Sequence, residues 1–237
     1  MIFGAILAGG IGSRMNISDM PKQFLPLGEK PIIIHTIEKF LLCKRIDFLY
    51  IGVHADWVSH MEDLLEKYHL KSGKITIAVG GVDRNSTIQN IILQIEKDYG
   101  ENDEHIIVTH DSVRPFVTLR IIEENIDAAL SNGACDTVVP AIDTIVVSED
   151  HEVISSIPNR NFMYQGQTPQ SFRISLLKRL YADLSKEEKS VLTDACKICV
   201  VRNTPVKLVT GEISNLKITT VSDYKIAQAM LGGMKVD

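Results

Sequence analysis

The sequence predicts an α/β protein with a mostly parallel central sheet between two layers of helices, and a short β-arm that projects from it. Two observations predict this fold. Up to about residue 140, apolar runs alternate with segments whose apolar residues recur every three or four positions, as Ile88, Ile91 and Ile95 do. After Ile142 this alternation stops. Strand–helix–strand order with continuously apolar strands is typical of a parallel sheet covered on both faces.

The expected elements follow one another along the chain. Strands are expected at 2–8, 46–53, 74–79, 105–110 and 134–141. Helices are expected between them, near 31–43, 56–69, 84–98 and 118–131. In such a sheet, ligands bind beyond the carboxyl ends of the strands. The turns at 9–22, 80–87 and 110–115, and the region after 141, are therefore the candidate parts of a site.

The second half of the chain is less regular. Residues 142–160 contain two short β-like runs around the acidic turn "SEDHE", which indicates a projecting hairpin. The polar segment 161–172 is expected to be irregular. Helices are expected after Ser185, which has capping-box spacing to Glu188, across "TDACKICVV", and at the C-terminus after a strand-like piece, with a cap near Ser222. No linker or repeat interrupts the chain, so we expect a single domain over 1–237 with an arm at about 142–160.

The composition excludes several classes of protein. Of 237 residues, 45% are hydrophobic and 23% are charged, which is typical of a soluble protein, and a net charge of -5 argues against a nucleic-acid partner. The sequence contains no apolar stretch of about 18 residues, as a membrane span needs, and its start lacks a basic region, so we expect a cytoplasmic protein. Cys196 and Cys199 form a CxxC pair without the second pair of a zinc site, so we interpret them as reduced core residues.

The first turn, "LAGGIGSRM", has the bare backbone that lets N–H groups approach an anion. A dinucleotide fingerprint would need a third glycine where Met15 stands, and a P-loop would need a lysine directly after the glycines. The remaining interpretation is that the turn, together with Arg14 and Lys22, holds a nucleoside triphosphate. A structural turn with surface cations is an equally weighted alternative from this turn alone.

Two further strand ends carry ligand-like chemistry. Gly80 and Gly81 would let a flat base approach beside the hydroxyls of Ser86 and Thr87, although ordinary helix capping explains the same polar residues. Asp111, at the end of the fourth strand, is a natural Mg²⁺ ligand beside a triphosphate. The alternative for Asp111 is an ion pair with Arg114 that braces the turn.

These motifs resemble a known family. "LAGGIGSRM…PKQF", "GGVDR", "HDSVRP", "TPQSF", "TDAC" and "NLKITT" are similar to the cytidylyltransferases of the 2-C-methyl-D-erythritol 4-phosphate cytidylyltransferase type, in family order, over essentially the whole chain. "MYQGQTPQSF", "HTIEKF" and "NLKITT" resemble the ribitol-5-phosphate branch, which makes CDP-ribitol for teichoic-acid-type polymers. The resemblance implies a Rossmann-like three-layer sandwich of the nucleotide-diphospho-sugar transferase type.

The resemblance also implies an activity and partners. Such an enzyme joins CTP to a polyol phosphate and releases pyrophosphate, with Mg²⁺ as cofactor. The acceptor would be D-ribitol 5-phosphate or, alternatively, 2-C-methyl-D-erythritol 4-phosphate. A nucleotide-sensing module without turnover is a third hypothesis. We expect a homodimer formed through the arm, a polyol-phosphate dehydrogenase as functional partner, and neither nucleic acid nor membrane.

The residue roles carried by the resemblance fall into three groups. Arg14 and Lys22 would act in catalysis on the triphosphate, and Asp111 would hold Mg²⁺. The residues expected against the nucleotide are Leu7, Ala8, Gly9, Gly10, Gly12, Gly81, Val82, Asp83, Arg84, Asn85, Ser86, Thr87, Asp111 and Ser112. The residues expected against the acceptor are Arg160, Lys217, Thr168, Thr144 and Thr193.

Overall fold

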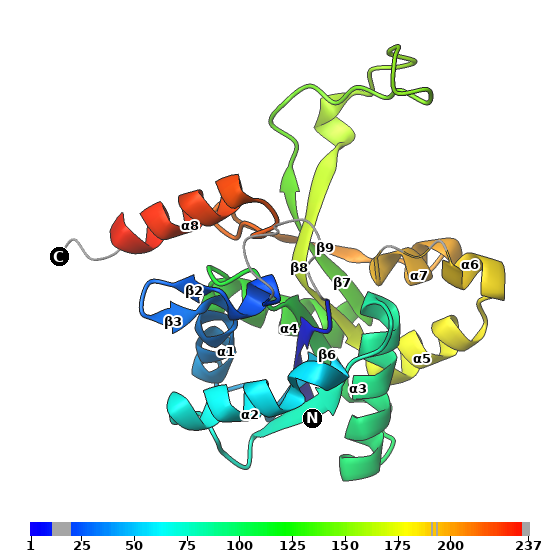
Figure 1. The fold of residues 1–237 in the computed structure, drawn as a ribbon. Helices are drawn as coiled ribbons and strands as arrows, with labels where there is room; N and C mark the ends of the chain where they lie inside the picture. Colours follow the sequence, from blue (N-terminus) through cyan, green and yellow to red (C-terminus); the bar gives the residue numbers. More distant parts are fainter. Residues whose placement is uncertain (11–19, 191, 193, 234–237) are drawn as a thin grey trace.

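A seven-stranded sheet forms the centre of the computed structural model, which describes residues 1–10, 20–190, 192 and 194–233 (Figure 1). Its strands lie in the order β5-β4-β1-β6-β8-β7-β9. Their bounds are β1 Ile2–Ala8, β4 Phe48–Val53, β5 Ile75–Val79, β6 Ile106–Asp111, β7 Ala134–Pro140, β8 Tyr164–Arg173 and β9 Lys207–Thr210. All neighbouring strands are parallel except β8, which runs antiparallel to both β6 and β7.

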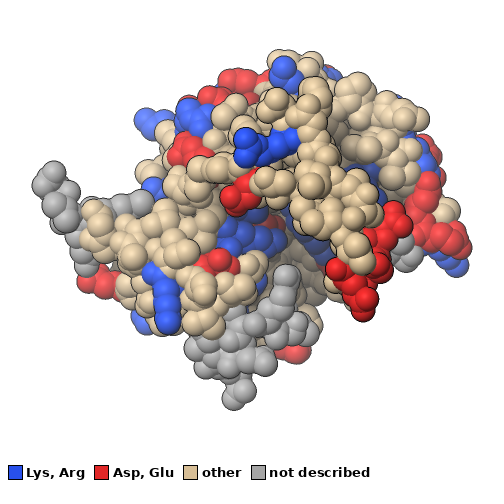
Figure 2. Space-filling view, turned by 90° about the horizontal axis from the view of Figure 1, so that it is seen from above, with Lys and Arg blue, Asp and Glu red and all other residues tan. Residues whose placement is uncertain are grey.

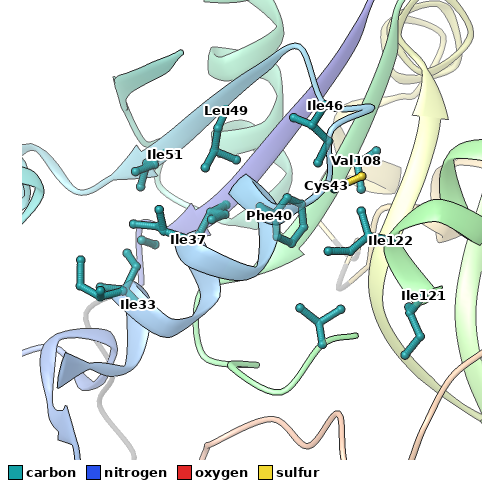
Figure 3. Close-up of a cluster of buried hydrophobic side chains, with 14 of the residues drawn as sticks. Ile33, Ile37, Phe40, Cys43, Ile46, Leu49, Ile51, Val108, Ile121 and Ile122 are labelled. Atoms are coloured by element: carbon teal, nitrogen blue, oxygen red, sulfur yellow. The ribbon is translucent and has the colours of Figure 1, made fainter. Parts of the chain in front are cut away.

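Helices cover both faces of this sheet (Figure 1). One layer contains α1 (Ile32–Leu42), α2 (Val58–Lys67) and α4 (Leu119–Asn132), and the other contains α3 (Arg84–Tyr99), α5 (Ile174–Ala182) and α7 (Cys196–Val201). Successive side chains of β1 alternate between them, because strand residues point to opposite faces: Ile6 joins the first core and Phe3 the second. Figure 3 shows the first core, where Ile37 and Phe40 of α1 pack near Leu49 and Ile122.

A third, smaller core fixes the segment that follows the first turn. The strands β2 (Pro26–Leu27) and β3 (Lys30–Pro31) form an antiparallel pair, and α8 (Val221–Gly233) packs against it. Leu27 and Ala227 are fully buried there, and the Tyr224 hydroxyl donates a hydrogen bond to the carbonyl of Pro26. The chain therefore ties its N-terminal third to its C-terminal helix.

Most expected elements are confirmed within a few residues. The five strands of the first 140 residues and the four helices between them are present. The helix across "TDACKICVV" is α7, and Ser185 and Glu188 form the expected reciprocal cap before α6 (Lys186–Ser190). The four cysteines are buried free thiols. None of the described helices is both long and apolar enough to cross a membrane.

Two expectations about the elements of the second half were wrong. The segment 161–172 is not irregular but contains most of β8, where several buried polar side chains form hydrogen bonds, such as that from Ser171 to Asn125. The piece before α8 is not a strand. The expected arm is present: residues 142–160 project from the sheet (Figure 1), and an antiparallel bridge between Val147 and Ser156 pairs its two sides.

The start of α8 also differs in its cap. The carboxylate of Asp223 accepts hydrogen bonds from the N–H groups of Thr219 and Thr220, at 2.9 and 2.7 Å. The Thr220 hydroxyl in turn accepts from the Asp223 N–H. The cap is therefore a Thr220–Asp223 pair and not Ser222.

The carboxylate of Asp136 is partly buried in the sheet, close to a second carboxylate, that of Asp194. Asp136, on β7, sits near Asp194 at the start of α7, and the amide nitrogen of Gln170 donates to both, at 3.0 and 2.7 Å. Burial, together with the charge of Asp194, raises the pKa of Asp136 to about 7. The folded chain thus holds a proton at Asp136 that the unfolded chain releases at lower pH.

Replacing Asp136 should therefore stabilise the fold at high pH. Its folded pKa lies above the ordinary 3.8, so the folded state binds more protons between about pH 4 and 7, and the free energy of unfolding falls as pH rises through that window. Asp136→Asn keeps the size and a hydrogen-bond acceptor but removes the charge. We expect its unfolding temperature to exceed that of the wild type at pH 8 and the gap to shrink at pH 5, measured by calorimetry. Asp103→Asn, at an exposed position, is the control; an equal shift at both pH values would contradict the argument.

Candidate active site

A pocket of about 340 Å³ opens at the carboxyl ends of β1 and β6. Seen from above, Lys and Arg side chains lie recessed in a hollow near the middle of this face (Figure 2). Among the described residues, five chain segments line the pocket: the end of β1, the 3-10 segment Lys22–Phe24, the turn before α3, the turn after β6, and the loop before α8. The lining residues are Leu7, Ala8, Gly9, Gly10, Lys22, Gln23, Gly81, Val82, Asp83, Arg84, Thr87, Asp111, Ser112, Val113 and Lys217.

The turn before α3 is held by Thr87. Its hydroxyl donates to the carbonyl of Asp83 at 2.8 Å and accepts from the Gly81 N–H at 3.0 Å. A Cβ on Gly81 would lie 2.3 Å from the Ser86 hydroxyl oxygen, and one on Gly9 would lie 3.1 Å from that of Thr87. Glycine at position 9 therefore lets the end of β1 approach the turn before α3, and glycine at position 81 leaves room for Ser86 within that turn.

Some polar residues of this turn cap the helix, as the alternative reading of the sequence proposed. Asp83 accepts from the Ser86 N–H at 2.7 Å, and the Ser86 hydroxyl accepts from the Asp83 N–H at 2.9 Å. Asn85 is buried, and neither it nor Ser86 lines the pocket. Val82, in contrast, is fully exposed at the rim.

The described start of the first turn, residues 8–10, is held by Gln23, which was not among the predicted site residues. The side-chain amide of Gln23 donates to the carbonyls of Ala8 and Gly10, at 2.9 and 3.0 Å, and is itself buried. It thereby ties the glycine turn to the short 3-10 segment Lys22–Phe24, which brings Lys22 to the pocket wall. The only sequence signal was its position directly after Lys22.

Three cations surround the carboxylate of Asp111. Lys217 lies 2.9 Å from one of its oxygens and Arg114 lies 3.5 Å from the same oxygen, while Arg84 lies 3.5 Å from the other. Burial favours the neutral acid, but the three cations outweigh it and hold the pKa of Asp111 well below its usual range. Three cations against one carboxylate leave two positive charges, so this end of the pocket attracts anions.

A neutral hydrogen-bond chain supports Asp111 from below. Thr168, itself buried, accepts from the Asp111 N–H at 3.2 Å, and its hydroxyl bonds to Nδ1 of His110 at 2.9 Å. The other ring nitrogen of His110 bonds to the carbonyl of Arg114 at 3.0 Å. Burial lowers the pKa of His110 to about 4, so the ring stays uncharged at neutral pH. Thr168 thus holds the backbone of Asp111 and lines neither this pocket nor the next one.

A second pocket, of about 320 Å³, adjoins the first through Lys217. Arg114 also faces it, and its guanidinium donates to the carbonyl of Asn215 at 2.7 Å. The other walls come from the ends of β7 and β8 and from the loop before α8. The lining residues are Arg114, Val139, Pro140, Ile142, Asp143, Gln165, Gly166, Gln167, Ile213, Leu216 and Lys217.

Several predicted site residues lie elsewhere. Arg160 and Thr144 are exposed on the projecting segment and line neither pocket; Arg160 donates to the carbonyl of Ile142 at 2.6 Å. Arg14, Gly12 and Thr193 lie outside the described residues. Apart from Asn85, Ser86 and Gly12, the residues predicted against the nucleotide all line the first pocket. Their roles stay predictions.

Comparison with known proteins identifies the family. The sequence model of the 2-C-methyl-D-erythritol 4-phosphate cytidylyltransferase family matches residues 2–233. The chain belongs to this family. It is a nucleotidyltransferase, more specifically a cytidylyltransferase.

Solved structures show the same fold. A 4-diphosphocytidyl-2C-methyl-D-erythritol synthase from Anaerococcus prevotii is 27% identical, with 98% of this chain and 96% of the other covered and a TM-score of 0.80. The 2-C-methyl-D-erythritol 4-phosphate cytidylyltransferases from Francisella tularensis and Thermus thermophilus are each 22% identical, with TM-scores of 0.79 and 0.73. They cover 96% and 97% of this chain and 98% of their own. The expected nucleotide-diphospho-sugar transferase type of fold is confirmed.

Substitution of Gly81 by alanine should show how much nucleotide binding depends on the absence of a side chain at this position. Gly81→Ala would place a Cβ 2.3 Å from the Ser86 oxygen, so the turn before α3 must shift. We expect CTP binding to weaken roughly ten-fold or more, as overpacking by about 1–3 kcal/mol implies. Titration calorimetry with CTP measures this.

The control for this substitution is Gly73→Ala, where a Cβ would meet no atom within 4 Å. It should bind CTP as the wild type does. Wild-type affinity in Gly81→Ala would show that the turn does not approach the nucleotide.

Proposed function

We propose that this protein transfers CMP from CTP, bound in the first pocket, to a phosphorylated polyol bound in the second, and releases pyrophosphate. One observation carries the proposal: the two pockets meet at Lys217, whose ammonium lies 2.9 Å from Asp111. A cation at this junction stands where the α-phosphate of one substrate must meet the phosphate of the other.

The reaction needs charge stabilisation more than proton transfer. An oxygen of the acceptor phosphate attacks the α-phosphorus, a new P–O bond forms, and the bond to pyrophosphate breaks with its electron pair on the leaving oxygen. A phosphate is already a nucleophile at neutral pH, so positioning and cations suffice. In this proposal Lys22 and Arg14 neutralise the triphosphate and Lys217 and Arg114 hold the acceptor phosphate.

Asp111 fits the role of Mg²⁺ ligand. It is a carboxylate held ionised on the wall of the first pocket, and Mg²⁺ favours one or two carboxylates together with phosphate oxygens. Lys217 occupies one side of one carboxylate oxygen, so the ion would share Asp111 with it. When bound, Mg²⁺ would neutralise charge on the phosphate oxygens of CTP.

For the acceptor we propose D-ribitol 5-phosphate. The segments that carry the resemblance to the ribitol branch also supply walls of the second pocket: Gln165, Gly166 and Gln167 come from "MYQGQTPQSF", and Leu216 and Lys217 from "NLKITT". The product would then be CDP-ribitol for teichoic-acid-type cell-wall polymers, made in the cytoplasm. A polyol-phosphate dehydrogenase that reduces a keto-sugar phosphate would supply the acceptor.

The comparisons support the other acceptor, 2-C-methyl-D-erythritol 4-phosphate. The family model and the solved structures cited above all carry that compound or its cytidylyl product in their names. It is therefore the second candidate, and it uses the same two pockets and the same cations.

Pyrophosphate release separates the candidates. The purified protein is given CTP and Mg²⁺ with each of the two polyol phosphates in separate reactions, and omission of CTP provides the blank. We expect release with D-ribitol 5-phosphate. Release with the erythritol phosphate alone would assign the enzyme to isoprenoid synthesis, and no release with either would overturn the proposed transfer.

The same assay checks the junction residue. Lys217→Met keeps the aliphatic stem but removes the charge, and we expect kcat to fall roughly 10²-fold, as for the loss of one donor to a developing charge. The control, Lys225→Met, changes an exposed lysine on α8 and should leave turnover unchanged.

We also propose that two copies of the chain associate through residues 142–162. Exposed apolar side chains gather on this segment, which is unusual for surface that faces only water. They are Ile142, Val146, Val147, Val153, Ile154, Ile157 and Phe162. A second copy would cover them and would bring Arg160 and Thr144 of one arm toward the partner's pockets.

The association state tests this proposal. We expect sedimentation equilibrium to give twice the chain mass of 26.4 kDa. Ile154→Asp should weaken the dimer and lower turnover together, because a charge would be buried in the interface. Leu93→Asp, on the exposed side of α3, is the matched control. A monomeric wild type at assay concentration would contradict the proposal.

A further inference from the structure

The second pocket has two chemically different ends. Arg114 and Lys217 form a cationic end beside Asp111. The remaining lining is largely apolar or backbone, from residues such as Val139, Ile142 and Leu216. A polyol phosphate fixed by its phosphate at the cationic end would extend its hydroxyl-bearing carbons along this lining.

Two side-chain carboxamides of β8, those of Gln165 and Gln167, belong to the lining of the second pocket. That of Gln167 is already hydrogen-bonded within the protein. Gln165 and Gln167 point to the same side of the strand because they are two residues apart. The Gln167 nitrogen donates to the carbonyl of Glu212 at 2.8 Å, and its oxygen accepts from Asn215 at 3.2 Å. Gln167 is largely buried, and both its amide nitrogen and its amide oxygen already have partners in the protein.

Gln165 differs from Gln167 both in its exposure and in its hydrogen bonding. Its side chain is exposed and lines the pocket, and it forms no hydrogen bond within the part of the chain that the structure describes. Its backbone is fixed all the same, because β8 pairs here with β7, with Gln165 opposite Val139. A rigid strand therefore presents a carboxamide whose donor and acceptor are both available.

We infer that Gln165 determines acceptor specificity by hydrogen bonding to hydroxyl groups of the polyol phosphate held at Arg114 and Lys217. The inference rests on the proposed function. A hydroxyl both donates and accepts, and a carboxamide offers one group of each kind. A pocket that pairs with substrate hydroxyls rejects analogues without them by large factors, because its own polar groups are then left unpaired.

The test compares two acceptors that differ only in hydroxyl groups. They are D-ribitol 5-phosphate and 5-hydroxypentyl phosphate, which keeps the five carbons, the phosphate and the terminal hydroxyl. For 2-C-methyl-D-erythritol 4-phosphate the corresponding analogue is 4-hydroxy-3-methylbutyl phosphate, which keeps the methyl group and lacks only the two internal hydroxyls. The measured quantity is the ratio of kcat/KM for the polyol to kcat/KM for its analogue, obtained from pyrophosphate release.

Gln165→Met keeps the length of the side chain and removes its hydrogen-bonding groups. We expect the ratio to fall at least ten-fold, through a higher KM for the polyol, while the KM for CTP stays within two-fold of the wild-type value. A general defect of folding would lower both activities and leave the ratio unchanged. Gln94→Met, the same substitution on α3, is the control and should not alter the ratio.

The outcomes separate the two proposals. An unchanged ratio in Gln165→Met, with an active wild type, overturns the role of Gln165 alone. A wild type that releases no pyrophosphate with either polyol phosphate overturns the proposed function and this inference together. Loss of CTP affinity in Gln165→Met also overturns the inference, because the effect would then lie in the first pocket.

Discussion

The site depends on one buried carboxylate and the cations that it gathers. Asp111 lies at the end of a central strand, where burial favours its neutral form and so raises its pKa, but Arg84, Arg114 and Lys217 outweigh burial and keep it ionised. The cations keep Asp111 ionised, and the ionised carboxylate in turn holds cations from three separate parts of the chain at one point. Without Asp111, three positive side chains would repel one another at a place where the chain offers no other described partner for Lys217.

The support for this cluster is neutral and hydrogen-bonded. His110 and Thr168 hold the backbone on either side of Asp111, and Asn215 ties the loop of Lys217 to β8 through the carbonyl of Thr168 at 2.8 Å. Because these side chains carry no net charge, they fix the geometry without altering the balance between Asp111 and its cations. Buried networks of this kind specify one arrangement when their members are satisfied.

The sequence predicted the regular half of the fold well, because the period of its apolar residues differs between strand and helix. It failed at β8, where Gln170 and Ser171 are polar but buried and so leave no hydrophobic period; the Gln170 nitrogen and the Ser171 hydroxyl find partners distant in sequence. The glycine turns and Asp111 were predicted as site residues because strand ends converge at one edge. Gln23 was not, since nothing in the local sequence shows that its amide reaches back to Ala8 and Gly10.

The antiparallel direction of β8 determines where the connection between β7 and β8 can become longer or shorter. Since β8 runs against β6, its first residue lies at the same edge of the sheet as the last residue of β6. The connection from β7 to β8 must therefore leave and re-enter at that edge, and residues 141–163 project from it (Figure 1). The base of this connection reaches the acceptor side, because Ile142 and Asp143 line the second pocket. A change in the length of this connection would remodel the surroundings of the acceptor while every core strand kept its register. The topology thus separates the part of the molecule that has to be constant from the part that is free to vary.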